Sequence, residues 1–119
     1  MKKTLVLGAS DKAERYSNKA IRMLLAHQVE VVAIGNKKTE AYQIPIETEQ
    51  IYYTDIHTVT LYLNPTHQKA YYSYILSLKP KRIIFNPGTE NPELEQLAKA
   101  QGIAVLEACT LVLLSTGQY

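Results

Sequence analysis

The sequence is poor in several residue types whose presence would point to a particular class of protein. Its 119 residues include one cysteine, one phenylalanine and no tryptophan. Because Cys109 is the single cysteine, the chain cannot form an internal disulfide, which excludes a disulfide-stapled secreted scaffold. The cysteine content therefore favours a reducing compartment, and we expect a cytoplasmic protein.

Long apolar runs and an excess of one charge are also missing. No apolar stretch approaches the ~20 residues of a membrane span, and charged residues soon follow the short run after Lys3, so neither a membrane helix nor a secretory signal is expected. Lysine and arginine number 13 against 11 acidic residues and are scattered, which argues against a nucleic-acid partner. The length predicts a single domain, 1–119, with its own core.

What the sequence does contain is an alternation of apolar β-rich runs with segments of helical periodicity. The predicted strands are 4–7, 29–34, 59–63, 82–85 and 103–106, with 44–46 as a short additional edge piece. The predicted helices cover about 17–27, 65–78, 92–101 and 109–114. This order predicts an α/β fold: an open parallel sheet of about five strands with helices on both faces, in three layers.

Ligands of such sheets bind at the carboxyl ends of the strands, which here lead into loops 8–17, 35–38, 63–66 and 86–90. The first apolar run ends at the small residues Gly8-Ala9-Ser10. A turn with so little side-chain bulk lets its backbone approach an anion, and the N-terminus of the next helix attracts one. Because no G-x-G-x-x-G is present, the turn predicts a nucleotide-type ligand without identifying it.

The loop after the second strand bears on which nucleotide would fit. A typical NAD site has an acidic residue at this position to hold the ribose hydroxyls, whereas this chain has Asn36 followed by Lys37 and Lys38. Cations favour a phosphorylated ribose, as found in NADP and coenzyme A. Lys12 and Arg15 in the first loop are either further phosphate contacts or solvent-facing residues.

Several short segments, taken in order, resemble the small stand-alone CoA-binding proteins, Rossmann-like domains similar to the N-terminal domain of the succinyl-CoA synthetase alpha subunit. These segments are Gly8-Ala9-Ser10, Arg15-Tyr16-Ser17-Asn18, Glu30-Val31-Val32, Asn86-Pro87-Gly88, Gly102-Ile103 and Cys109. The resemblance extends from Lys3 to about Leu111. It implies one domain that holds CoA, with the diphosphate at the first turn and the adenosine end near the loop after the second strand.

Three segments depart from the pattern of that family. The usual Asn-Pro-Lys after the second strand is replaced by Gly35-Asn36-Lys37, which keeps the cation but not the proline. After the third strand, Leu63-Asn64 stands where the family favours an aromatic residue and arginine, so one cationic partner is lost. After the fourth strand, Asn86-Pro87-Gly88 replaces Gln-Pro-Gly and retains an amide.

From these observations we expect non-catalytic binding of CoA or an acyl-CoA, because no constellation of nucleophile, base and oxyanion donors can be assembled from the sequence. The candidate cofactor-binding residues are Gly8, Ala9, Ser10, Lys12, Arg15, Ser17, Asn36, Lys37, Leu63, Asn64, Asn86, Pro87 and Gly88. Two alternatives are an NADP- or other nucleotide-dependent enzyme subunit and a degenerate interaction domain.

Two further groups of side chains invite a functional reading. Glu107 is the carboxylate expected on the ligand side of the sheet and the one worth testing for chemistry. The nine tyrosines are unusual in number. Tyr71, Tyr72 and Tyr74 either pack in the core with their hydroxyls at the surface or cover the face of a homodimer. The three histidines and one cysteine show no metal-ligand spacing.

Overall fold

The apolar runs that the sequence predicts as buried strands lie side by side in one sheet. The computed structural model describes residues 2–119 of the protein. Five parallel strands occur in the spatial order β2-β1-β5-β6-β7. Their bounds are β1 (Thr4–Ala9), β2 (Val31–Gly35), β5 (Thr58–Leu61), β6 (Arg82–Phe85) and β7 (Ala104–Glu107). β1 is almost wholly buried, as its unbroken apolar run predicts for a strand covered on both faces.

The sheet has seven strands rather than about five, because the weakly patterned segment after β2 folds as a hairpin. β3 (Thr39–Ala41) pairs antiparallel with β4 (Ile44–Glu47), and β4 pairs in parallel with β2. The predicted edge piece 44–46 therefore lies inside the sheet, and β3 forms the edge. The two turn residues, Tyr42 and Gln43, have φ angles of 52° and 67°. Tight hairpins require this conformation, but the Asn or Gly that usually signals it is absent.

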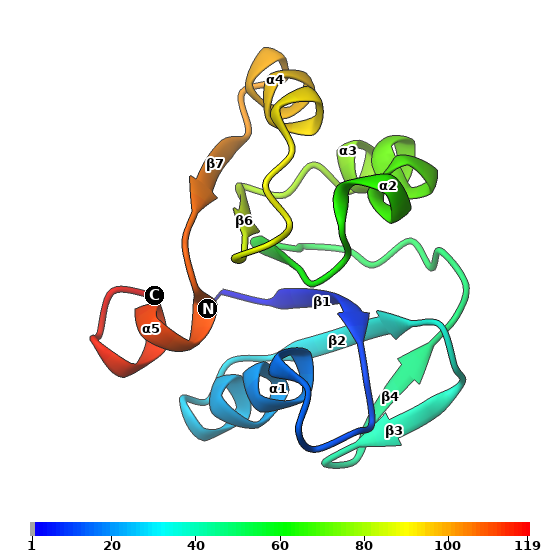
Figure 1. The fold of residues 1–119 in the computed structure, drawn as a ribbon, viewed down its shortest axis with the longest axis vertical. Helices are drawn as coiled ribbons and strands as arrows, with labels where there is room; N and C mark the ends of the chain where they lie inside the picture. Colours follow the sequence, from blue (N-terminus) through cyan, green and yellow to red (C-terminus); the bar gives the residue numbers. More distant parts are fainter. Residues whose placement is uncertain (1) are drawn as a thin grey trace.

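Helices cover both faces of the sheet, as predicted (Figure 1). α1 (Tyr16–Ala26) and α5 (Thr110–Ser115) lie on one face. The other face carries α2 (Pro65–Gln68), the 3-10 turn η1 (Lys69–Tyr71), α3 (Tyr72–Leu78) and α4 (Pro92–Ala100). None of the helices within residues 2–119 is long and apolar enough to cross a membrane.

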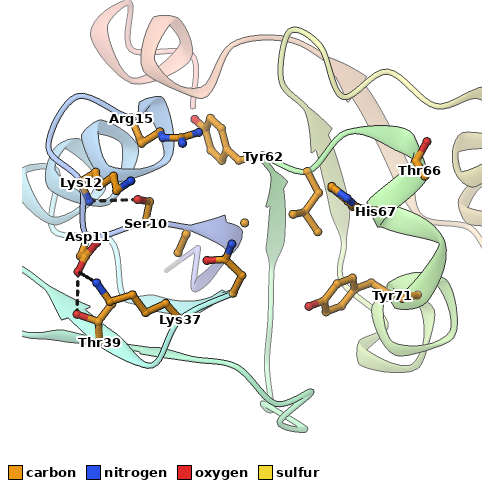
Figure 2. A pocket seen from close by; sticks show the side chains of 15 residues that line it. Ser10, Asp11, Lys12, Arg15, Lys37, Thr39, Tyr62, Thr66, His67 and Tyr71 are labelled. Atoms are coloured by element: carbon orange, nitrogen blue, oxygen red, sulfur yellow. Dashed lines mark hydrogen bonds and ion pairs between the residues drawn. The ribbon is translucent and has the colours of Figure 1, made fainter.

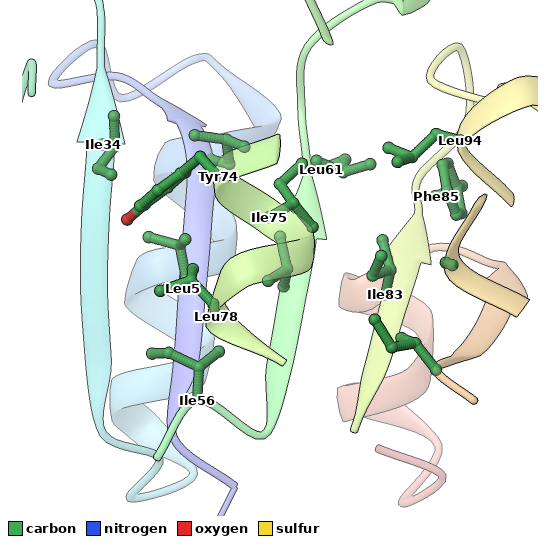
Figure 3. Close-up of a cluster of buried hydrophobic side chains, with 14 residues drawn as sticks. Leu5, Ile34, Ile56, Leu61, Tyr74, Ile75, Leu78, Ile83, Phe85 and Leu94 are labelled. Carbon is green, nitrogen blue, oxygen red and sulfur yellow. The ribbon is translucent and has the colours of Figure 1, made fainter. Parts of the chain in front are cut away.

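Each face of the sheet has its own apolar core. On the α3 and α4 side, Leu5 belongs to a cluster with Ile75, Leu78 and Phe85 (Figure 3). On the α1 side, Val6 packs in a second cluster with Ile21 and Leu24. Consecutive residues of β1 thus supply opposite cores, which fixes the register of the central strand, because a one-residue slip would exchange the two faces.

The predicted helix 65–78 is three segments rather than one. It begins as predicted, with Pro65 at its first position, and the Asn64 side chain caps it by accepting a hydrogen bond from the His67 amide at 3.0 Å. The 3-10 turn η1 then separates α2 from α3. Lys79 ends α3 in a left-handed conformation directly before Pro80. Apolar spacing alone does not distinguish a continuous helix from one interrupted by a tighter turn.

The strand order reverses between β1 and β5, the position at which open α/β sheets bind ligands. Gly8 lies there, at a register shift in β1 and with a φ of 96°. A Cβ at this position would lie 2.9 Å from the carbonyl carbon of Tyr62 and 3.0 Å from its oxygen. Only glycine therefore lets the loop after β1 lie against the loop after β5.

Candidate functional site

Two cavities open at the carboxyl edge of the sheet and adjoin at the reversal point, and Figure 2 shows the larger of them. The larger, about 750 Å³, extends from the end of β2 to α2 and η1. The smaller, about 380 Å³, extends from the start of α1 to the loop after β6. Gly8, Ser10, Arg15 and Tyr62 line both, so the two cavities form one elongated site with a shared middle.

The structure brings together all but one of the candidate residues predicted from the sequence. The larger cavity is lined by Gly8, Ala9, Ser10, Lys12, Arg15, Asn36, Lys37 and Leu63. The smaller is lined by Gly8, Ser10, Arg15, Ser17, Asn64, Pro87 and Gly88. Because these residues come from four separate loops, their convergence follows from the parallel sheet, which aligns the carboxyl ends of its strands.

Asn86 is the exception and lines neither cavity. Its side chain is 2% exposed, and its amide donates to the Thr60 hydroxyl at 2.7 Å and to the Leu61 carbonyl at 2.9 Å. Its side-chain oxygen accepts from the Thr110 amide at 2.8 Å. The Asn86 amide group therefore connects β5, β6 and the start of α5, and its role is structural.

A chain of hydrogen bonds connects the loop after β1 to the turn between β3 and β4. The Tyr42 hydroxyl donates to Asn18 at 2.5 Å, and the Asn18 amide donates to the Ser10 carbonyl at 3.0 Å. The Ser10 hydroxyl in turn accepts from the Lys12 amide at 3.1 Å. The β3–β4 turn thus supports the loop that forms the shared middle of the site.

Helix α1 begins beside this loop without a side-chain cap or an acidic residue in its first turn. The first amides of a helix have no partner within it and carry a partial positive charge. α4 differs, since Asn91 caps it and Glu93 and Glu95 lie in its first turn. The start of α1 therefore retains its capacity to attract an anion.

Three cations line the larger cavity: Lys12, Arg15 and Lys37. Arg15 and Tyr62 both line the shared middle, and the Arg15 side chain points toward the Tyr62 ring in Figure 2. Lys38 lines neither cavity and instead forms an ion pair with Glu47 at 3.0 Å. Of the two adjacent lysines predicted from the sequence, only Lys37 belongs to the site.

A carboxylate that sequence reasoning missed lies beside Lys37. The Asp11 Oδ2 atom is 3.2 Å from the Lys37 ammonium and accepts a hydrogen bond from the Thr39 hydroxyl at 3.0 Å. The hydrogen bonds from Thr39 and Lys37 lower the pKa of Asp11 below its ordinary value, so this carboxyl is ionised at neutral pH. The acidic group that is absent from the end of β2 is thus supplied from the loop after β1.

The loop after β6 is a tight turn whose amide also has a carboxylate partner. The Thr89 amide donates to the Asn86 carbonyl at 2.9 Å, and Gly88 has a φ of 91°, the arrangement of a type II turn with Pro87 before the glycine. The Gly88 amide donates to the Glu90 carboxylate at 3.0 Å. Pro87 has no N–H, so Gly88 provides the backbone donor of the Pro87-Gly88 pair. In this structure the Glu90 carboxylate accepts its hydrogen bond.

Gln68 joins the loops that form the far wall of the site. Its side chain is fully buried, and its amide nitrogen donates to the Leu63 and Thr89 carbonyls, each at 2.8 Å. Its oxygen accepts from the Asn91 amide at 2.8 Å. One side chain thereby fixes the loop after β5 to the loop after β6.

Four further residues of α2 and η1 line the larger cavity: Thr66, His67, Ala70 and Tyr71. His67 and Tyr71 are four residues apart, which places them on one side of the helical segment, facing the cavity (Figure 2). Their four-residue spacing was the sequence feature that could have indicated this, but many pairs on protein surfaces share it. No sequence feature near Tyr62 indicated that it would line the site.

The Tyr62 side chain is largely buried. Burial raises the pKa of its hydroxyl.

The tyrosines considered for a dimer face have partners within the chain. Tyr74 is buried and its hydroxyl donates to the Ile51 carbonyl at 2.5 Å. The Tyr72 hydroxyl donates to Glu93 at 3.0 Å, and Tyr71 lines the larger cavity. These contacts agree with the packing alternative for the three residues, and a homodimer stays a prediction.

Glu107 lies outside both cavities and is paired with another carboxyl group. Burial, and after it the neighbouring Glu107 carboxyl, raises the pKa of Glu95 of α4. The Glu95 Oε2 atom is buried without a hydrogen-bond partner among the described residues. Within residues 2–119, no group of three or more His, Cys, Asp or Glu is arranged to hold a metal ion.

This carboxyl pair predicts a stabilising substitution, Glu95→Gln. Because the folded state disfavours the ionised Glu95, the penalty is absent at pH values below the ordinary pKa of 4.5. It grows as the pH rises from there toward the raised folded-state pKa and is complete above it. We expect thermal unfolding to show Tm raised by about 2–4 °C at pH 7 and unchanged at pH 4. Glu93→Gln, in the same helical turn, is the control and should bring no gain. An equal gain from both variants would contradict the pairing.

Comparisons with known proteins place the chain in a family. The family model described as CoA binding domain matches residues 2–115. The crystal structure of an uncharacterized protein is 49% identical, with a TM-score of 0.98, covering 100% of this chain and 98% of that one. A comparison with curated proteins gave no match.

More distant structures share the fold. A hypothetical protein from Pyrococcus horikoshii OT3 is 26% identical, with a TM-score of 0.85 over 93% of this chain and 80% of that one. The structure of cell-free ID.343 from Thermus thermophilus is 20% identical, with a TM-score of 0.86 over 99% and 90% of the two chains. The resemblance predicted from the sequence is confirmed: with a family model that spans nearly its whole length, the chain belongs to the family of CoA binding domains.

Proposed function

We propose that this protein binds CoA or an acyl-CoA in the two adjoining cavities and does so without catalysis of its own. The observation that carries the proposal is the shared middle of the site, where Gly8, Ser10 and Arg15 line both cavities at the strand-order reversal. CoA is an elongated molecule with a diphosphate between a nucleoside and a flexible tail. Its shape calls for two compartments joined at an anion-binding turn.

The chemistry of the donors supports this fit. A Cβ at Gly8 would meet the Tyr62 backbone, so the turn can only be formed by a residue without a side chain. The uncapped start of α1 and the Arg15 guanidinium supply positive charge at this turn. The diphosphate would lie here, with the adenosine in the larger cavity and the tail in the smaller one.

The walls of the smaller cavity suit the amide-rich tail of CoA. They carry the hydroxyls of Ser10, Ser17 and Thr89 and the Asn64 side chain. Among the residues that line it, none is a cysteine, histidine or carboxylate. The proposal of binding without catalysis therefore rests on the polar but weakly reactive character of this lining.

The decisive test measures binding of CoA by calorimetry and by the thermal shift of the purified protein. A ligand that binds only the folded state stabilises it by mass action, so Tm should rise with CoA concentration. Arg15→Ala should weaken CoA binding by about tenfold, the effect of losing one charge-assisted hydrogen bond. Arg22→Ala is the matched control, because Arg22 is an exposed arginine of α1, the helix that Arg15 precedes, and lines neither cavity.

Two outcomes would contradict the proposal. One is the absence of any thermal shift at millimolar CoA. The other is a stronger response to NADP than to CoA, which would favour a nucleotide-dependent enzyme subunit instead. If the Arg15 and Arg22 variants lost the same amount of affinity for CoA, Arg15 would have no specific role in the site. The proposal that the protein binds CoA would still stand.

A further inference from the structure

We propose that Asp11 is a specificity-determining residue, which cancels the charge of Lys37 and makes the site accept an unphosphorylated ribose as readily as a ribose phosphate. This inference deepens the proposed function and rests on it. The ligand class that this inference predicts is a nucleoside diphosphate with free ribose hydroxyls. Dephospho-CoA, which is CoA without its ribose phosphate, belongs to this class. The carboxylate comes from the loop after β1, and the lysine follows β2.

The contact is built from three separate segments. Asp11 precedes α1, Lys37 follows β2, and Thr39 begins β3. The Asp11 Oδ2 atom receives both the Lys37 ammonium at 3.2 Å and the Thr39 hydroxyl at 3.0 Å. All three residues line the larger cavity (Figure 2). The hydrogen bond from Thr39 helps to hold the carboxylate in place.

The exposure of the two charged side chains decides which of them a ligand meets. The Asp11 side chain is 26% exposed and the Lys37 side chain 68% exposed. Lys37 can therefore turn toward a phosphate, but Asp11 stays at the wall of the cavity. A phosphate that recruits Lys37 would break the ion pair and come to lie close to the Asp11 carboxylate, a like charge.

An unphosphorylated ribose would not be repelled by the Asp11 carboxylate. A carboxylate accepts hydrogen bonds at both oxygens, so Asp11 can receive a ribose hydroxyl while it keeps Lys37 and Thr39. The remaining cations of the cavity, Lys12 and Arg15, come from the first loop, where the diphosphate would lie. Lys38 cannot replace Lys37, because it lines neither cavity and pairs with Glu47. The ribose end of the site is therefore electrically neutral.

The test compares CoA with dephospho-CoA by calorimetry on the wild-type protein and on Asp11→Asn. In the wild type, the two affinities should agree within about threefold. Asp11→Asn removes the like charge and frees Lys37, so CoA should bind at least tenfold more tightly, whereas dephospho-CoA should change by less than threefold. Asp11→Ser is a second variant with the same expectation, in case the asparagine variant folds poorly.

Glu14→Gln is the matched control, since it removes one negative charge from the same loop at an exposed residue that lines neither cavity. It should leave the ratio of the two affinities unchanged. A wild-type protein that prefers CoA by tenfold or more, or a ratio that Asp11→Asn and Asp11→Ser leave unaltered, would overturn the role of Asp11 but not CoA binding. Failure of both ligands to bind to every variant would overturn the proposed function and this inference together.

Discussion

Replacement of Gly35 by alanine is expected to cost about 3 kcal/mol of folding free energy, because overpacking against a rigid neighbour has no cheap relief. Gly35 ends β2 and pairs with Ala9 of β1. A Cβ at this position would lie 2.3 Å from the Ala9 carbonyl oxygen and 3.0 Å from a methyl group of Ile46. The nearest atom is backbone of the central strand, which cannot rotate away.

The loss should be visible as a fall in Tm of roughly 10–20 °C and as a lower urea midpoint. Because Ala9 lines the larger cavity, the thermal shift produced by CoA should fall as well. Gly102→Ala is the control: its φ is 76° but a Cβ would meet nothing within 4 Å, so it should lose only the backbone strain of about 1–2 kcal/mol. A Gly35 variant no less stable than this control would show that the end of β1 can move.

Gln68→Leu is expected to destabilise the protein by about 3–5 kcal/mol. The substitution preserves much of the side-chain volume but leaves the Leu63 and Thr89 carbonyls without the partner that Gln68 provides. It also removes one of the two hydrogen bonds that the Asn91 amide donates, the other being to the Tyr72 hydroxyl. Each buried group that loses its partner typically costs about 1–3 kcal/mol. Chemical denaturation would measure the loss.

The matched control for this variant is Gln50→Leu. Gln50 also donates an amide hydrogen bond to a backbone carbonyl, that of Ala70 at 3.0 Å, but it is exposed. Water can replace its single bond, so the change should stay within about 0.5 kcal/mol. Similar losses from both variants would mean that burial does not set the strength of the Gln68 contacts.

The parts of the fold that were predictable have local signals. β6 occupies the predicted residues 82–85. A short run of β-branched residues between turn residues is a local pattern that is sufficient to predict a strand. α4 begins at Asn91 and Pro92 as predicted, because a capping side chain and a proline act within one turn. The antiparallel hairpin escaped prediction because Tyr42 and Gln43 adopt left-handed conformations that their identities do not advertise.

In the site, the residues next to strand ends were predictable and their mutual contacts were not. Any residue that follows a parallel strand reaches the same edge, so Ser10 and Lys37 could be placed from their positions alone. The pairing of Lys37 with Asp11 joins residues 26 positions apart. Such a contact depends on how two loops approach each other, which hydrophobic periodicity does not encode.

The β3–β4 hairpin contributes Thr39 to the wall of the larger cavity. The two strands of the hairpin are neighbours in sequence, so their pairing closes only a short loop and carries a small entropic penalty. Substitutions there that retain the Tyr42 hydroxyl, and with it the support of the first loop through Asn18, would alter the surroundings of Lys37 while leaving Gly8 and Arg15 in place. If CoA binds as proposed, relatives of this protein could change the nucleoside that they accept by changes in the hairpin alone, while the same first loop binds the diphosphate.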